Sequence, residues 1–115
     1  MKKRIEIAGA GISGLTASII LAKNGYNVTV YELSNHAGGR FKEDWQNLEN
    51  WTKNKDILEY LKEIGLEINF FAKPCYCFSL YTSSFRKIEI KSSKPLFYSV
   101  KRGEPQDSID SGLLR

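Results

Sequence analysis

The sequence predicts an α/β fold that opens with a βαβ unit and continues into a helix and short antiparallel strands. Two observations carry this prediction. Within residues 3–33 the apolar positions change from a period of two to a helical period and back again. Farther along, short β-rich runs are separated by Ser- and Pro-containing turns, without the helices that parallel strands need between them. We therefore expect parallel pairing only at the start of the chain.

The first unit runs from strand to helix to strand within residues 3–33. Residues 4–8 alternate apolar and polar side chains, as a short strand does. Residues 12–24 have apolar side chains on one helical face and precede Gly25, which suits the end of a helix. Residues 27–32 are alternating and β-branched, so they predict a second strand, parallel to the first and joined by a right-handed crossover. The helical face consists of Leu15, Ile19 and Ala22.

The remainder of the chain divides into three parts. Residues 34–44 form a loop rich in Ser, Asn and Gly, residues 45–102 hold a helix and antiparallel strands, and residues 108–115 begin a further helix. Residues 42–54 are polar, contain both tryptophans and show no clear period. The expected elements are a helix from Asn54 or Asp56 to about Ile64, ended by Gly65, and strands at Leu66–Ala72, Tyr76–Tyr81, Arg86–Lys91 and Leu96–Lys101.

The composition is that of a globular protein with a modest basic excess. Hydrophobic residues make up 42% and charged residues 26%, and the net charge is +4. Because the basic residues are scattered and no DNA- or RNA-binding motif accompanies them, we expect no nucleic-acid partner. No stretch has the length and apolar character of a membrane-spanning helix, so membrane association is not indicated here.

Two cysteines, Cys75 and Cys77, form a Cys-x-Cys pair. If both lie in one strand, their side chains point to opposite faces and cannot form a disulfide. The spacing also differs from the Cys-x-x-Cys pairs of redox and zinc sites. We therefore expect two reduced thiols and a cytoplasmic location. A place beside a bound cofactor is the alternative interpretation of these cysteines.

A glycine pattern lies between the first strand and the first helix. Gly9, Gly11 and Gly14 form Gly-x-Gly-x-x-Gly, and Glu32 closes the second strand 18 residues after Gly14. A strand before the pattern, a helix after it and an acid about 20 residues on are the context of the Rossmann dinucleotide-binding fingerprint. All three conditions are met. The sequence therefore predicts a Rossmann-like βαβ unit that binds FAD or NAD(P), and a βαβ unit with incidental glycines is the alternative.

Each residue of the pattern has a physical role in such a site. Gly9 permits the tight turn, Gly11 lets a pyrophosphate approach the backbone, and Gly14 lets the helix pack close to the strand. The free N–H groups of the helix N-terminus then attract the pyrophosphate. Glu32 accepts hydrogen bonds from the adenosine ribose and repels a 2′-phosphate, which disfavours NADP at this loop.

A second short motif, Gly38-Gly39-Arg40, follows the acid after a brief loop. Plain NAD-binding Rossmann domains do not require this element. A guanidinium at this place can donate charge-assisted hydrogen bonds to the pyrophosphate. A surface turn with an exposed arginine is the alternative interpretation.

The stretch "GAGISGLTASIILAKNGYNVTVYELSNHAGGRF" resembles the FAD-binding N-terminus of the glutathione-reductase-like flavoprotein superfamily. The resemblance implies FAD as the cofactor, with NAD(P)H as a candidate electron donor. Together with the segment discussed next, it implies cofactor contacts at Gly9, Ala10, Gly11, Ile12, Ser13, Gly14, Glu32, Gly39, Arg40 and Arg102.

The later segments "EDWQNLENW", "NFFAKPC" and "PLFYSVKRGEPQDSIDSGLL" resemble the geranylgeranyl-reductase-related NAD(P)/FAD-dependent oxidoreductases. In that group a strand ends in Arg-Gly and an Asp a few residues on precedes a helix. The matching residues here are Arg102, Gly103 and Asp110, and the resemblance implies that Arg102 also approaches the flavin nucleotide. Amine oxidases and phytoene desaturases share the Gly-Gly-Arg motif and are the second assignment.

These resemblances imply the FAD-binding portion of a flavin-dependent oxidoreductase that acts on an apolar or isoprenoid-like substrate. Because such enzymes have a third parallel strand, a substrate domain and a C-terminal FAD-binding segment, we expect an incomplete N-terminal portion without turnover of its own. A separately encoded C-terminal portion is then a candidate partner. A non-catalytic dinucleotide-binding module and a non-functional remnant are the alternatives.

The sequence names no catalytic residue and no metal site. His36 is either an exposed loop residue or a general base. Trp45 and Trp51 either pack in the core or flank a flavin ring.

Overall fold

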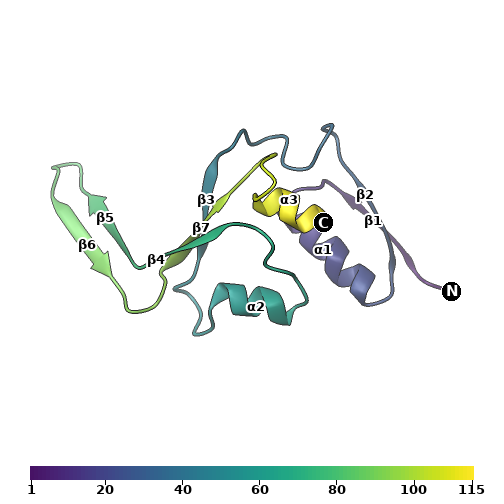
Figure 1. The fold of residues 1–115 in the computed structure, drawn as a ribbon, viewed down its shortest axis with the longest axis horizontal. Coiled ribbons are helices and arrows are strands. Elements are labelled where there is room, and N and C mark those ends of the chain that lie inside the picture. The colour runs from purple at the N-terminus through teal and green to yellow at the C-terminus, as the bar shows by residue number, and fades with distance from the viewer.

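The computed structural model describes all residues 1–115, and its elements follow the order β1–α1–β2–β3–α2–β4–β5–β6–β7–α3 (Figure 1). They fall into a parallel pair β1–β2, an antiparallel sheet of order β3–β7–β4, and a hairpin β5–β6. The predicted α/β fold with parallel pairing only at its start is confirmed. The bounds are β1 Arg4–Ala8, α1 Ile12–Lys23, β2 Asn27–Tyr31, β3 Trp45–Glu49, α2 Ile57–Glu63, β4 Ala72–Cys75, β5 Cys77–Tyr81, β6 Lys87–Lys91, β7 Phe97–Lys101 and α3 Ile109–Leu114.

The βαβ unit has one apolar and one polar face. The parallel register sets Ile5 beside Val28 and Ile7 beside Val30, and α1 covers these side chains. On the opposite face, Glu6 forms an ion pair with Arg4 at 2.7 Å and accepts a hydrogen bond from the hydroxyl of Tyr31 at 3.2 Å. Parallel sheets are usually covered on both faces, whereas this sheet is covered only on its α1 side, since Glu6 and Tyr31 on the other face are exposed.

Helix α2 begins where its capping residue lies. The carboxylate of Asp56 accepts hydrogen bonds from the N–H groups of Leu58 and Glu59, which identifies Asp56 and not Asn54 as the N-cap. The hydroxyl of Tyr98 donates to the same carboxylate at 2.6 Å. This contact attaches the start of α2 to the central strand β7. The helix ends before Gly65, whose φ of 99° is one that glycine adopts freely.

The hydrophobic core lies where α1, α3 and β7 meet. Helices α1 and α3 lie side by side in this region (Figure 1). Val100 of β7 is 1% exposed and Ile109 of α3 is 4% exposed. A short C-terminal helix therefore holds much of the core together. The buried cluster consists of Ala10, Leu15, Ala37, Leu66, Phe70, Val100, Ile109 and Leu113.

The hairpin β5–β6 projects from the body at the far end from β1 and β2 (Figure 1). Its register sets Phe78 beside Ile90 and Leu80 beside Ile88, so one face of the hairpin is apolar. Leu80 is 49% exposed and remains in solvent. The radius of gyration is 16.8 Å, whereas a compact chain of this length is expected at roughly 13 Å. The projecting hairpin explains the difference.

Two sequence predictions about the strands were wrong. The expected strand Leu66–Ala72 is largely a loop, and only Ala72 belongs to a strand. Its apolar residues Leu66 and Phe70 instead pack in the core cluster. Strand β3 was missed because it lies at an edge of its sheet, where Leu48 is its only half-buried residue and no apolar alternation is needed.

Neither tryptophan packs in the core, which was one of the two interpretations of these residues. Trp45 is 55% exposed and Trp51 is 60% exposed. The two cysteines do not share a strand, because Cys75 ends β4 and Cys77 begins β5. Both thiols are free, as expected; Cys75 is half-buried and Cys77 is exposed.

Candidate functional site

The glycine loop turns the chain from β1 into α1. Gly9 has a φ of 99°, and its N–H donates to the carbonyl of Tyr31 at 2.6 Å. Gly14 packs against the loop so closely that a Cβ atom there would lie 2.1 Å from the carbonyl oxygen of Gly9. Gly11 has no neighbouring atom within 4 Å of such a Cβ position and is exposed. There is therefore no room for a side chain at Gly14, whereas the backbone at Gly11 faces open space.

The start of α1 offers hydrogen-bond donors. Its N-cap is Gly11, which has no side chain to cap the first turn, and no acidic residue lies in that turn. The first N–H groups of a helix have no partner within the helix. They carry the positive end of the helix dipole, which attracts anions. Ile12 and Ser13 are the first two residues of this helix.

Glu32 binds back onto the glycine loop. One carboxylate oxygen accepts a hydrogen bond from the Ala10 N–H at 2.7 Å, and the other accepts one from the Ser34 N–H at 2.9 Å. These two backbone donors, Ser34 first and Ala10 next, lower the pKa of Glu32 below its ordinary value of 4.5. The carboxylate is therefore ionised at neutral pH, and each oxygen retains a lone pair for another donor.

A groove of about 830 Å³ starts at Ala10 and Glu32 and runs along α1 beside α3. Its volume is within the range of small-molecule sites. The predicted helix face, Leu15, Ile19 and Ala22, lines its wall. Of the predicted cofactor contacts, Ala10 and Glu32 thus line the groove. Other predicted contacts lie outside its lining, namely Gly9, Gly11, Ile12, Ser13, Gly14, Gly39, Arg40 and Arg102.

The Gly-Gly-Arg motif forms a turn on the surface. The N–H of Phe41 donates to the carbonyl of Gly38 at 2.9 Å, which closes the turn around Gly39 and Arg40. Gly38 has a φ of 73°. Arg40 is exposed and makes no hydrogen bond or ion pair. Its guanidinium is therefore available to a ligand.

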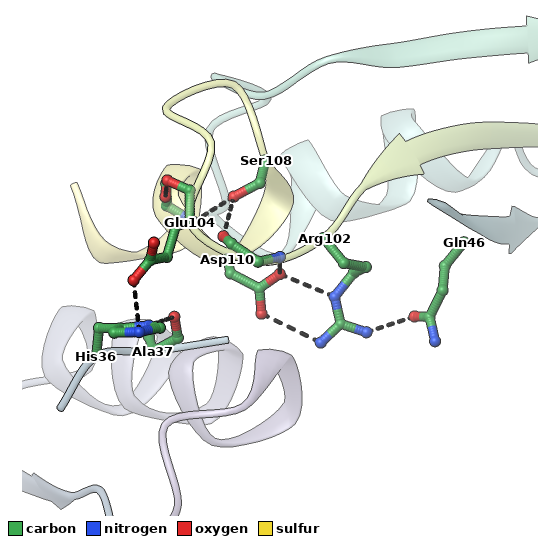
Figure 2. Close-up of polar contacts among 9 residues, drawn as sticks. His36, Ala37, Gln46, Arg102, Glu104, Ser108 and Asp110 are labelled. Carbon is green, nitrogen blue, oxygen red and sulfur yellow. Dashed lines mark hydrogen bonds and ion pairs between the residues drawn. The ribbon is translucent and has the colours of Figure 1, made fainter. Parts of the chain in front are cut away.

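Arg102 is buried in an ion pair. Its Nε donates to Asp110 Oδ2 at 2.9 Å and its Nη2 donates to Asp110 Oδ1 at 3.1 Å, while Nη1 donates to Gln46 (Figure 2). The ring of Phe41 covers the guanidinium, with Cζ 3.8 Å from the ring centroid. The Arg102 side chain is only 5% exposed. A direct contact between Arg102 and a cofactor remains a prediction.

A second polar contact joins the loop after β2 to the loop after β7. Nε2 of His36 lies 2.5 Å from a carboxylate oxygen of Glu104 (Figure 2). Sequence reasoning identified His36 but not Glu104, Gln46 or Ser34. No local signal marks these three residues, because the partners of Glu104 and Gln46 lie far away in the chain and Ser34 contributes only its backbone N–H.

No group of three or more His, Cys, Asp or Glu side chains is placed to hold a metal ion. No helix has the length and apolar character that crossing a membrane requires.

A family model described as "NAD(P)-binding Rossmann-like domain" matches residues 7–63, about half of the chain. These residues include the glycine loop, α1, β2, Glu32 directly after it, and the Gly-Gly-Arg turn. Over these residues the chain is similar to that family, and its βαβ unit has the Rossmann-like fold. The prediction from Gly-x-Gly-x-x-Gly and its acid is confirmed at this level, whereas no comparison tests the individual contact residues.

Curated relatives resemble the Rossmann-like domain and the segment after it. The chain is 41% identical over 113 residues to an L-amino-acid oxidase from Sistrurus catenatus edwardsii, covering 89% of this chain and 22% of that protein. It is 40% identical over 81 residues to an L-amino acid oxidase from Bothrops pictus, covering 62% of this chain and 16% of that protein. The chain thus spans about a fifth of the length of the curated relatives it matches.

Solved structures share the arrangement of the whole chain. The structure superposes on 2-methyl-3-hydroxypyridine-5-carboxylic acid oxygenase with a TM-score of 0.68 and 21% sequence identity, covering 99% of this chain and 28% of that one. The superposition includes the antiparallel sheet and α3 as well as the Rossmann-like domain. It shows a shared fold.

Proposed function

We propose that this chain is the FAD-binding portion of a flavin-dependent oxidoreductase. The position of the Glu32 carboxylate, which follows β2 and accepts a hydrogen bond from Ala10, next to the open backbone at Gly11 carries the proposal. The ionised carboxylate of Glu32 suits ribose hydroxyls, and the open space at Gly11 suits the approach of a pyrophosphate to the backbone. The exposed guanidinium of Arg40, eight residues after Glu32 in the chain, adds a cation to this motif. These features fit an adenine dinucleotide.

Glu32 has a defined task in this proposal. Its carboxylate keeps its hydrogen bond to Ala10 and thereby holds the loop, while its remaining lone pairs accept from the ribose. The first turn of α1 stabilises the pyrophosphate through its N–H groups. FAD, when bound, supplies the redox chemistry. NAD(P)H is a candidate electron donor, and the chain, which spans about a fifth of the length of its curated relatives, is expected to lack turnover on its own.

Among flavoproteins, an amine-oxidase-like protein is the assignment that we favour. The 41% identity to an L-amino-acid oxidase extends over 89% of the chain, well beyond the glycine loop. It suggests an amine-bearing substrate for the whole protein. The geranylgeranyl-reductase-like assignment is the second candidate, supported by the adjacency of Arg102, Gly103 and Asp110, which the resemblance linked. A separately encoded C-terminal portion as partner and a cytoplasmic location, which the two free thiols favour, remain proposals.

The decisive experiment is a titration of FAD with purified chain, followed by flavin fluorescence, with NAD⁺ as competitor. We expect saturable binding that Glu32→Ala weakens about tenfold, since the ribose loses an ionic acceptor. The matched control is Glu67→Ala, which removes an exposed acid from another part of the groove wall. Binding of NAD⁺ in preference to FAD would favour a plain dinucleotide-binding module. Equal effects of the two variants would refute the role of Glu32.

A second measurement separates binding from catalysis. The chain loaded with FAD is mixed with NADH or NADPH under anaerobic conditions, and flavin reduction is followed by absorbance. We expect no reduction beyond that of free FAD. Faster reduction would show that the chain holds an electron-donor site and would contradict the expectation that it lacks turnover.

A further inference from the structure

One buried ion pair holds both ends of the turn that carries Arg40. At the first end, Gly38 lies against Asp110, where a Cβ atom would be 2.7 Å from Cγ of the carboxylate. At the second end, the ring of Phe41 covers the guanidinium of Arg102 at 3.8 Å. The turn between these two contacts is closed by the hydrogen bond from the Phe41 N–H to the Gly38 carbonyl.

The ion pair is itself fixed in orientation. Asp110 is fully buried and accepts three hydrogen bonds, two from Arg102 and one from the Gly103 N–H at 2.9 Å (Figure 2). A bidentate arginine–carboxylate pair allows little rotation of either group. Gly103 also lies against the turn, since a Cβ atom there would be 2.6 Å from the carbonyl oxygen of Phe41. Ion pair and turn therefore form one packed unit.

Arg40 is the exception in this unit, because it is exposed and unpaired. A cation on a fixed turn loses less conformational freedom on binding an anion than a cation on a loose loop. We propose that Asp110 and Arg102 are positioning residues, which hold the Gly38–Phe41 turn so that Arg40 binds the pyrophosphate. Arg102 thus acts through Arg40 and not by touching the cofactor. This inference rests on the proposed FAD binding.

The test compares two ligands in a double-mutant cycle. FAD contains the pyrophosphate, whereas AMP shares only the adenosine and one phosphate. We expect Arg40→Gln and Asp110→Asn each to raise the Kd for FAD about tenfold and to leave the Kd for AMP within about twofold. Because Asp110 acts through Arg40, the double variant binds FAD no more weakly than Arg40→Gln alone. The matched control, Asp107→Asn, alters an exposed acid that pairs with Lys101 and leaves both values unchanged.

Three results would overturn the inference: an unchanged Kd for FAD in Asp110→Asn, an equal loss of FAD and AMP, or additive losses in the double variant. If Asp110→Asn does not fold, Phe41→Leu takes its place, because it uncovers the guanidinium and keeps the ion pair. The same pattern of Kd values is then expected.

Hydrogen exchange separates this inference from the proposed function. A wild-type chain that binds neither ligand would refute the proposed function, but the turn can still be judged from the Phe41 amide. Asp110→Asn or Phe41→Leu must speed its exchange at least tenfold and leave that of the Leu15 amide, which bonds to Gly11 in α1, unchanged. Unchanged exchange at Phe41 would overturn the positioning role.

Discussion

Gly38 lies directly against the carboxylate of Asp110, where an added Cβ atom would be 2.7 Å from Cγ. Gly38→Ala is therefore expected to cost about 3 kcal/mol of unfolding free energy, from the clash and from a φ of 73°. The control is Gly25→Ala, where φ is 86° but no atom lies within 4 Å, with an expected cost of about 1 kcal/mol. Urea unfolding measures both. Equal costs would contradict the close contact.

Substitution by alanine is expected to affect stability at Gly14 and FAD affinity at Gly11. Gly14→Ala brings a methyl group 2.1 Å from the Gly9 carbonyl oxygen, so it should destabilise the fold by about 3 kcal/mol. Gly11→Ala meets no atom within 4 Å and should change stability by less than about 1 kcal/mol. Its methyl group occupies the pyrophosphate approach, so the Kd for FAD should rise at least about tenfold. An unaffected Kd in folded Gly11→Ala would exclude a pyrophosphate at this position.

Tyr98 makes stability depend on alkaline pH. Burial, together with the hydrogen bond to Asp56, raises the pKa of Tyr98 well above 10. The unfolded chain loses this proton near pH 10 while the folded chain keeps it, so stability is expected to fall as pH rises above about 10. Tyr98→Phe should remove this dependence, and Tyr81→Phe, at an exposed position, should not. Urea unfolding at about pH 8 and 11 gives the unfolding free energy of each variant at both values. An equal loss of unfolding free energy between the two pH values in Tyr98→Phe and Tyr81→Phe would contradict the prediction.

Glu32 makes cofactor binding depend on acid pH. Its pKa lies below 4.5 because the Ser34 and Ala10 N–H groups stabilise the carboxylate. The carboxylate of the folded chain therefore takes up its proton only below pH 4.5, so the Kd for FAD should stay constant from pH 7 down to about 5 and rise at a pH below 4.5. The Glu32→Gln variant should bind FAD weakly, with a Kd that does not change over the same pH range. A rise in the wild-type Kd already at pH 6 would assign the effect to another group.

The sequence predicted the βαβ unit well because its signals are local. The glycine pattern, the alternation of residues 27–32 and Gly25 each specify a backbone conformation within a few residues. The N-cap of α2 was predicted for the same reason, with Asp56 as one of two candidates. Strand β3 was not predictable in this way, because an edge strand needs only partner hydrogen bonds from β7 and no apolar alternation.

The site was predictable in its parts but not in its connections. The resemblance linked Arg102 with Asp110 and the Gly-Gly-Arg motif identified Gly38 separately, but no local pattern indicates that Asp110 also contacts Gly38. That contact depends on α3 packing beside α1, which brings together residues some 70 positions apart along the chain. For the same reason, the burial of Arg102 against Phe41 and Gln46 could not be inferred from the sequence, because an arginine is usually exposed.

The position of α3 in the core has a consequence for biosynthesis. Leu15 and Ala10 share their buried cluster with Ile109 and Leu113. The ribosome makes α3 about 80 residues after the βαβ unit, which at roughly 5–20 residues per second is a delay of several seconds. During that interval the apolar face of α1 lacks the partners that α3 supplies, so we expect the nascent βαβ unit to bind chaperones. Folding of this chain is therefore expected to be completed only after the last residues of α3 have left the exit tunnel.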